Sequence, residues 1–190
     1  MFRRPTGPAA VAAALLLAGP LPAVIQRLTP LKEVLAAVQY IFVAAVEALD
    51  PQRPAAVLAV REDLKGKVPS RRLPLTLVGD REAQREKQAP QLLDRLAPKL
   101  ELVVFASRRG QRTTAFAFTN GTWFQFTDDP GATSGEAQFT FTHLEPYLRR
   151  TFKGTTAELK RVVADALADR KPPPEPDATE PPGLGPPVKK

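Results

Sequence analysis

The stretch FAFTNGTWFQF, Phe116–Phe126, decides the fold of this chain because it predicts two β-strands joined by a tight turn. Apolar and polar residues alternate on both sides of Asn120-Gly121, and Asn-Gly is a dipeptide that two-residue hairpin turns favour. Side chains alternate between the two faces of an extended chain, so the two phenylalanines of each strand share a face. We therefore predict a hairpin within a sheet that buries these rings.

The same spacing recurs in a third strand, which follows the loop DDPGATSGE. We expect the phenylalanines of the three strands to form one inner lining: Phe116, Phe118, Phe124, Phe126, Phe139 and Phe141. Burial of each ring contributes about 1.5–3 kcal/mol, so core packing explains the aromatic density. Trp123 has the opposite parity to Phe124 and either packs under a helix or is exposed; only an exposed Trp123 suggests binding.

Further strands are indicated by apolar runs that end in turn residues. Besides the three strands above, they cover residues 38–49, 55–62, 71–80 and 100–107. The first two are joined by the turn DPQRP at 50–54 and are expected to pair. Pro74 cannot donate a hydrogen bond to a ladder, so its strand should lie on an edge or begin there.

Three helices complete the expected α+β domain. The first begins at Thr29-Pro30, where a hydroxyl can cap free amides and proline is tolerated in the first turn. Asp80 caps the middle helix, which Pro90 bends or divides. The C-terminal helix begins after Thr155, with Glu158 placed to complete a capping box.

Both ends of the chain lie outside the expected single domain of residues 24–170. Residues 1–23 follow the order of a secretory signal peptide: Arg3 and Arg4, an apolar run, and small residues near the cleavage site. The apolar run covers about half the length that a membrane-spanning helix needs. We expect an exported protein, in the periplasm, at the cell surface or secreted, with no transmembrane span after signal removal. The alternative is a segment retained as an anchor.

The C-terminal residues 171–190 contain eight prolines in the sequence KPPPEPDATEPPGLGPPVKK. Such a composition is typical of extended, solvated chain, because proline prevents regular hydrogen-bonded structure. We expect a disordered tail that serves as a linker, with a docking peptide as the alternative.

The composition excludes several kinds of chemistry. Cysteine is absent, which removes thiolate nucleophiles, redox motifs and disulfides. His143 is the single histidine, so sites with several histidines are excluded, and we expect no metal and no cofactor. His143 and Glu145 would share a face of extended chain, where they either form ordinary hydrogen bonds at a strand end or bind a metal weakly. We assign no catalytic residue.

The formal net charge of +7 would favour a polyanion, but the basic residues are scattered as pairs beside turns. Three of them, Arg149, Arg150 and Lys153, form an anion-binding patch with Lys65 and Lys67 if the fold brings these segments together. Candidate binding residues are therefore Trp123, Arg149, Arg150, Lys153, Lys65 and Lys67.

The segment from Val38 to Lys67, with its order of strand, turn, strand and LKG, resembles the netrin-like domains, which include the tissue inhibitors of metalloproteinases. The later VVFAS strand, hairpin and closing helix extend the resemblance to a cysteine-less bacterial exported type. It implies a mostly antiparallel, OB-like barrel or curled sheet of five to six strands that serves as a binding scaffold. The inhibitors hold the protease zinc through an N-terminal cysteine, so that activity does not carry over to a chain without cysteine.

These observations predict a non-catalytic exported module that binds another envelope or secreted protein. The alternative is a binder of polyanions or oligosaccharides through Trp123 and the arginine pairs. A weak hydrolase that depends on His143 is the third hypothesis. For an exported chain, we expect no intracellular nucleic acid among the partners.

Overall fold

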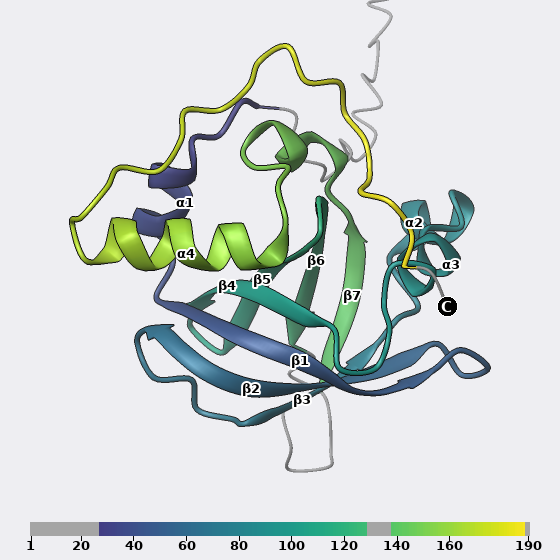
Figure 1. Ribbon diagram of the computed structural model, residues 1–190. Helices are drawn as coiled ribbons and strands as arrows, with labels where there is room; N and C mark the ends of the chain where they lie inside the picture. The colour runs from purple at the N-terminus through teal and green to yellow at the C-terminus, as the bar shows by residue number, and fades with distance from the viewer. Residues whose placement is uncertain (1–26, 129–137, 189–190) are drawn as a thin grey trace, which may run out of the picture.

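The computed structural model describes residues 27–128 and 138–188, so the predicted signal peptide lies outside the described residues. Seven strands form a closed barrel in this part of the chain (Figure 1). They are β1 (Tyr40–Asp50), β2 (Ala55–Lys65), β3 (Arg72–Thr76), β4 (Glu101–Arg109), β5 (Arg112–Thr119), β6 (Thr122–Asp128) and β7 (Phe139–Leu144). The α+β class is confirmed. The expected five to six strands were too few, because each of the three phenylalanine-bearing segments adds a strand to the four before them.

The strands follow the order β1-β2-β3-β7-β6-β5-β4 around the barrel, which β1 and β4 close. Every neighbouring pair is antiparallel except β3 and β7, which pair in parallel at Leu75↔Phe139 and Thr76↔Thr140. The parallel ladder begins one residue after Pro74. The prediction that this strand lies on an edge was wrong, because β3 pairs with β2 on one side and with β7 on the other in a closed barrel.

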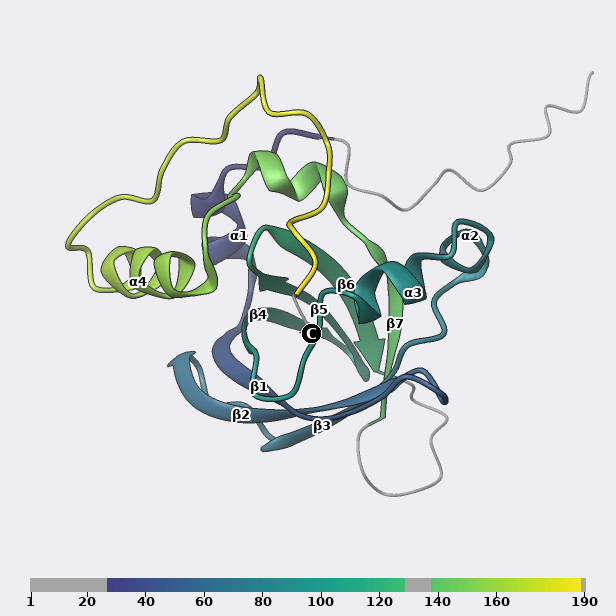
Figure 2. The same ribbon diagram turned by 45° about the vertical axis from the view of Figure 1, so that its right-hand side comes forward.

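Helices cover the outside and one end of the barrel (Figures 1 and 2). They are α1 (Leu31–Ala37), α2 (Arg81–Arg85), α3 (Gln88–Leu93), the 3-10 helix η1 (Pro146–Arg150) and α4 (Thr156–Leu167). None of the helices within residues 27–128 and 138–188 is long and apolar enough to cross a membrane.

The helix caps agree with the sequence at two of the three predicted positions. Asp80 accepts a hydrogen bond from the Ala83 amide, and Thr155 forms the predicted capping box with Glu158. Thr29, however, does not cap α1, because Pro30 occupies the N-cap position and no side chain caps it.

The predicted middle helix is two helices, and Pro90 does not divide them. The break falls at Lys87, which has a φ of 55° in the left-handed region. Pro90 lies in the first turn of α3, where a missing amide proton leaves no helical hydrogen bond unmade.

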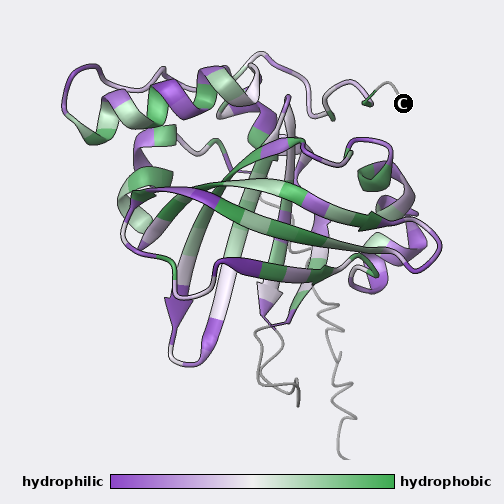
Figure 3. Cartoon of the chain, turned by 60° about the horizontal axis from the view of Figure 1, so that its bottom comes forward, coloured by the Kyte–Doolittle hydropathy of each residue, from purple (hydrophilic) through white to green (hydrophobic). Residues whose placement is uncertain are grey.

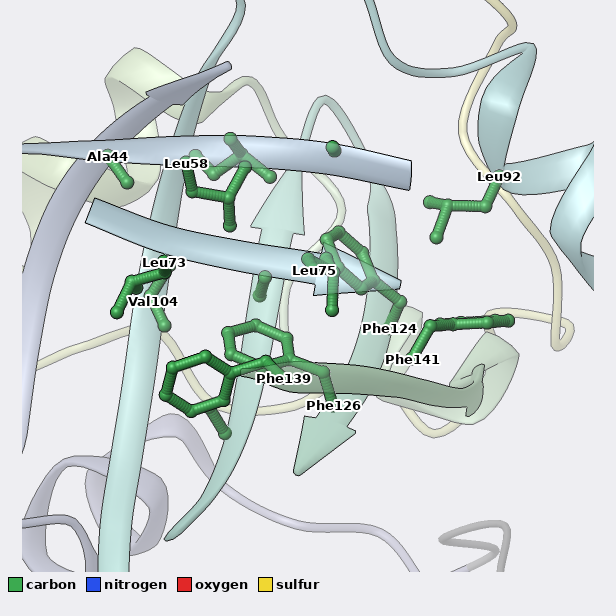
Figure 4. Packing of buried hydrophobic residues seen from close by; sticks show 14 of the residues in the cluster. Ala44, Leu58, Leu73, Leu75, Leu92, Val104, Phe124, Phe126, Phe139 and Phe141 are labelled. Carbon is green, nitrogen blue, oxygen red and sulfur yellow. The ribbon is translucent and has the colours of Figure 1, made fainter. Parts of the chain in front are cut away.

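The barrel interior holds one apolar cluster, to which every strand contributes. Phe124, Phe126, Phe139 and Phe141 meet leucines of β2 and β3 there, and Leu92 of α3 lies beside this core (Figure 4). Apolar and polar residues alternate along several strands in Figure 3, as expected for a barrel with one face inside.

A second apolar cluster lies outside the barrel, beneath α1 and α4. It is made of Leu31, Leu35, Val38, Ile41, Val103, Phe105, Phe118, Trp123, Leu148, Leu159 and Val163. Phe116 packs against this outer cluster too, so the prediction of one lining of six phenylalanines was wrong. The two-residue turn pairs Phe118 with Trp123, and directly paired residues share a face of the sheet. The phenylalanines of β5 therefore face the outside of the barrel with Trp123, whereas the phenylalanines of β6 face the interior.

Residues 171–188, for which the sequence predicts a disordered tail or linker, lie along the barrel as an extended strap without helix or strand. The strap (yellow) passes from the end of α4 over η1 towards α3 in Figures 1 and 2. The amides of Asp177 and Gly183 donate to the carbonyls of Arg150 and Pro146, at 2.8 and 3.1 Å. Leu184 packs against the core inside the barrel.

Candidate functional site

A groove of about 620 Å³ lies between α1 and the outer faces of β4 and β5. Its lining is mostly apolar and includes Val34, Val38, Phe105, Phe116, Trp123 and Leu148. The volume is within the range of roughly 300–1,000 Å³ that small-molecule sites occupy. The groove is thus an extension of the outer apolar cluster, open to solvent on one side.

Strand alternation produces a polarity gradient along this groove. Phe105, Ser107 and Arg109 follow one another on the groove face of β4, and Phe116, Thr114 and Arg112 do the same on β5. Both rows run from an apolar floor to an arginine at the end of the hairpin, which turns at Gly110. A molecule with an apolar body and an anionic end matches this gradient.

Arg109 and Arg112 are directly paired across the hairpin, so two positive charges face each other. Like charges at such positions are destabilising. Neither guanidinium forms an ion pair within the described part of the chain, whereas Arg27 at the same rim binds Glu33 at 3.1 Å. The hairpin end therefore carries a concentrated positive charge that an anionic ligand would neutralise. Strand alternation puts Arg112 on the face of Phe116, and a two-residue turn at Gly110-Gln111 pairs Arg109 with Arg112, so the sequence was sufficient to predict this placement.

Trp123 forms part of the groove wall and is not a stacking platform. Its side chain is only 1% exposed, and its indole nitrogen donates to the Phe152 carbonyl at 2.9 Å. The rings of Phe105 and Phe118 lie 5.6 and 4.9 Å from it. Of the two sequence alternatives, the packed indole is confirmed and the exposed one is wrong.

The predicted basic residues Arg149, Arg150 and Lys153 do cluster: the two arginines are the last residues of η1, and Lys153 follows three residues later. Their partners are carboxylates of the strap. Glu180 accepts from Arg149 Nε at 2.8 Å and from Lys153 Nζ at 2.6 Å, and Asp177 lies 3.1 Å from Lys153 Nζ. We call Arg149, Arg150 and Lys153 the cationic surface.

These ion pairs shift the pKa values of the groups that form them. Hydrogen bonds to Glu180 and then Asp177 raise the pKa of Lys153. The pKa of Asp177 falls to about 2, first because Thr179 donates to its carboxylate and then because Lys153 does. Lys153 and the Asp177 carboxylate are therefore ionised together at neutral pH.

Lys65 and Lys67 are at a different place, at the end of β2. Lys65 Nζ donates to the Leu35 carbonyl of α1 at 2.6 Å, which satisfies a helix carbonyl group near its C-terminus. Lys67 is exposed and follows Gly66, whose φ of 66° makes the turn. The contacts of these lysines thus do not join them to the cationic surface.

His143 lies in an enclosed polar cluster at the end of β7. Its Nε2 is 2.8 Å from Glu145 Oε1, and its Nδ1 is 3.5 Å from Asp80 Oδ2. Burial alone would lower the pKa of His143, but the hydrogen bond and charge of Glu145, with the charge of Asp80, raise it overall. The shared face of His143 and Glu145 is confirmed.

The His143 cluster offers little access for chemistry. Only 2% of His143 and none of Glu145 is exposed to solvent. Across residues 27–128 and 138–188, no three histidine or acidic side chains are grouped so that they could hold a metal ion. The arrangement links the cap of α2 to the end of β7, which is a structural task.

Comparisons with protein-family models, with curated proteins and with solved structures found no match to this chain. The site therefore has to be interpreted from its own residues.

Proposed function

We propose that the protein is a non-catalytic binding module, and that the groove between α1 and the β4–β5 hairpin holds its ligand. The ligand class is an amphipathic anion with an apolar chain and a carboxylate or phosphate at one end. The observation that carries this proposal is the gradient from Phe105 and Phe116 to the paired Arg109 and Arg112.

The energetics suit a ligand of this class. Each methylene buried on the apolar floor contributes about 0.8 kcal/mol, so affinity should rise with chain length until the groove is full. A charge-assisted hydrogen bond to a guanidinium is stronger than a neutral one, and an arginine can bind a carboxylate through two parallel bonds. The floor would thus provide most of the affinity and the arginines the preference for an anion.

The fluorescence of Trp123 reports directly on this groove, because it is the only tryptophan of the chain. Titration with dodecanoate should change the emission in a saturable way, and dodecanol should bind more weakly. Arg109→Ala/Arg112→Ala should weaken dodecanoate binding roughly tenfold and leave dodecanol binding unchanged. Arg108→Ala is the matched control, since Arg108 lies on the same strand but has the opposite parity. Equal affinities for the acid and the alcohol would overturn the proposal.

The barrel supports an OB-like scaffold for this module, as the resemblance to netrin-like domains implies. An OB-fold is a five-stranded Greek-key barrel. The present closed barrel would be an enlarged version with two more strands. Export remains part of the proposal, and it rests on residues 1–23. Sequencing the N-terminus of the protein recovered from the extracytoplasmic fraction would test it.

The second candidate is a polyanion binder, which the clustering of Arg149, Arg150 and Lys153 favours. Binding of this kind weakens steeply as salt rises, so retention on heparin that does not change with salt would contradict it. Oligosaccharide stacking on Trp123 loses support, because the indole is buried. For the third hypothesis, a hydrolase, the test is whether His143→Ala changes any hydrolysis that is detected.

A further inference from the structure

The strap binds the cationic surface through its backbone as well as its charges. Asp177 and Glu180 supply the carboxylates, and the Glu180 carbonyl accepts from Arg150 Nε at 2.9 Å. The amides of Asp177 and Gly183 donate to carbonyls of η1, as described above. Recognition of this kind requires an extended peptide. A polyanion without a peptide backbone would leave the carbonyl groups of η1 without these donors.

The cationic surface is held in place by contacts that do not involve the strap. Leu148 of η1 is buried in the outer cluster, and the Thr151 hydroxyl donates to the Thr29 carbonyl at 2.7 Å. Trp123 holds the next residue, Phe152, through its carbonyl. The surface should therefore keep its shape when the strap leaves.

The strap is held mainly by ion pairs and hydrogen bonds, which another peptide could form in its place. Most of its residues are exposed or half-buried, and Leu184 is its one apolar contact with the core among the described residues. Ion pairs near the surface contribute little to stability, because water and salt compete for the same charges. A second peptide with the same features could take its place.

We propose that the cationic surface is a docking site for an extended acidic segment of a partner protein, and that the strap is the built-in competitor for this site. The partner segment carries two carboxylates three residues apart, as Asp177 and Glu180 are, next to proline or glycine residues that keep it extended. This site is separate from the groove, so either proposal can fail without the other.

The test uses the full chain and a labelled synthetic peptide with the sequence of residues 172–188 as the probe. Asp177→Asn/Glu180→Gln in the protein weakens its own strap, so this variant should bind the acidic peptide roughly tenfold more tightly than the unchanged chain. A peptide with amides at these two positions should bind neither protein. Glu175→Gln is the matched control, because Glu175 pairs with Lys32 and not with the cationic surface.

Hydrogen exchange on the unchanged chain tests the proposal without any variant, because it measures directly whether the strap is displaced. Excess acidic peptide should speed hydrogen exchange at the Asp177 and Gly183 amides, because it displaces the strap. The amide peptide should not. Equal binding of both peptides, or retention of heparin without any binding of the acidic peptide, would overturn the proposal.

Discussion

Phe118 and Trp123 face each other across the β5–β6 hairpin, with ring centroids 4.9 Å apart, on the outside of the barrel. Phe152 packs edge-on against Phe118 at 5.5 Å. This aromatic group joins the barrel wall to the chain that leads into α4. The outer cluster is consequently a second core that the fold requires.

Phe118→Ala should lower the free energy of unfolding by about 3–5 kcal/mol, because it leaves a cavity among rings that cannot collapse freely. Phe116→Ala is the control on the same face of β5, and it should cost clearly less because Phe116 is only half-buried at the groove. Urea unfolding followed by circular dichroism measures both. Equal losses would contradict the assignment of Phe118 to a second core.

The sequence predicted this hairpin and its turn but not the side that each ring faces. Parity within one strand follows from the extended backbone, whereas parity between strands depends on which residues pair across the turn. With a two-residue turn at Asn120-Gly121, Thr119 pairs with Thr122, which puts Phe118 opposite Trp123. This step was available from the sequence. It would have shown that Phe118 and Phe124 cannot share one lining.

Gly121 is a point at which the hairpin, the cationic surface and the strap meet. Its φ is +81°, and a Cβ there would lie 2.9 Å from Arg149 Nη1 and 3.3 Å from Gly185 Cα. Gly121→Ala should therefore cost more than the roughly 1–2 kcal/mol of a left-handed alanine, and it should loosen the strap.

Gly110→Ala is the matched control for this substitution. Gly110 has a similar φ of +61°, but a Cβ there meets nothing within 4 Å. It should therefore show the backbone cost alone. Thermal unfolding compares the two variants, and hydrogen exchange at Gly183 reports on the strap. Equal costs with an unchanged strap would show that the close approach at Gly121 has no effect.

The pH dependence of stability should reveal the His143 cluster. Glu145 and Asp80 raise the pKa of His143 above its ordinary value of 6.5, so the folded state holds this proton more tightly than the unfolded state. The resulting stabilisation is complete below the unfolded pKa and is lost as pH rises through the folded pKa. Unfolding free energies measured from about pH 6 to about pH 9 should fall, and His143→Gln should flatten this part of the curve. If the unfolding free energy of His143→Gln falls with pH as steeply as that of the unchanged chain, other groups cause the pH dependence.

The candidate sites were harder to predict than the fold, for physical reasons that differ between them. Arg109 and Arg112 flank a visible glycine turn, but the helix that makes their face into a groove, α1, reaches it only through tertiary packing. The proline-rich composition of the strap is typical of chain without helix or strand, and this part of the chain has neither. The strap attaches because the spacing of Asp177 and Glu180 matches the positions of the basic residues on and after η1. The sequence does not reveal this match, because only the fold brings the two segments together.

Arg112→Glu should separate stability from binding at the groove. The new carboxylate would face Arg109 directly, so a like-charge pair would become an opposite-charge pair worth about 0.2–1 kcal/mol. We therefore expect a small rise in the free energy of unfolding together with a loss of dodecanoate binding measured by Trp123 fluorescence. Arg108→Glu changes the charge equally but faces Thr113, so it should raise neither stability nor affinity. A stability gain of this kind would indicate that the native arginine pair is kept for the anion it binds, because the fold itself is better served by a carboxylate at that position.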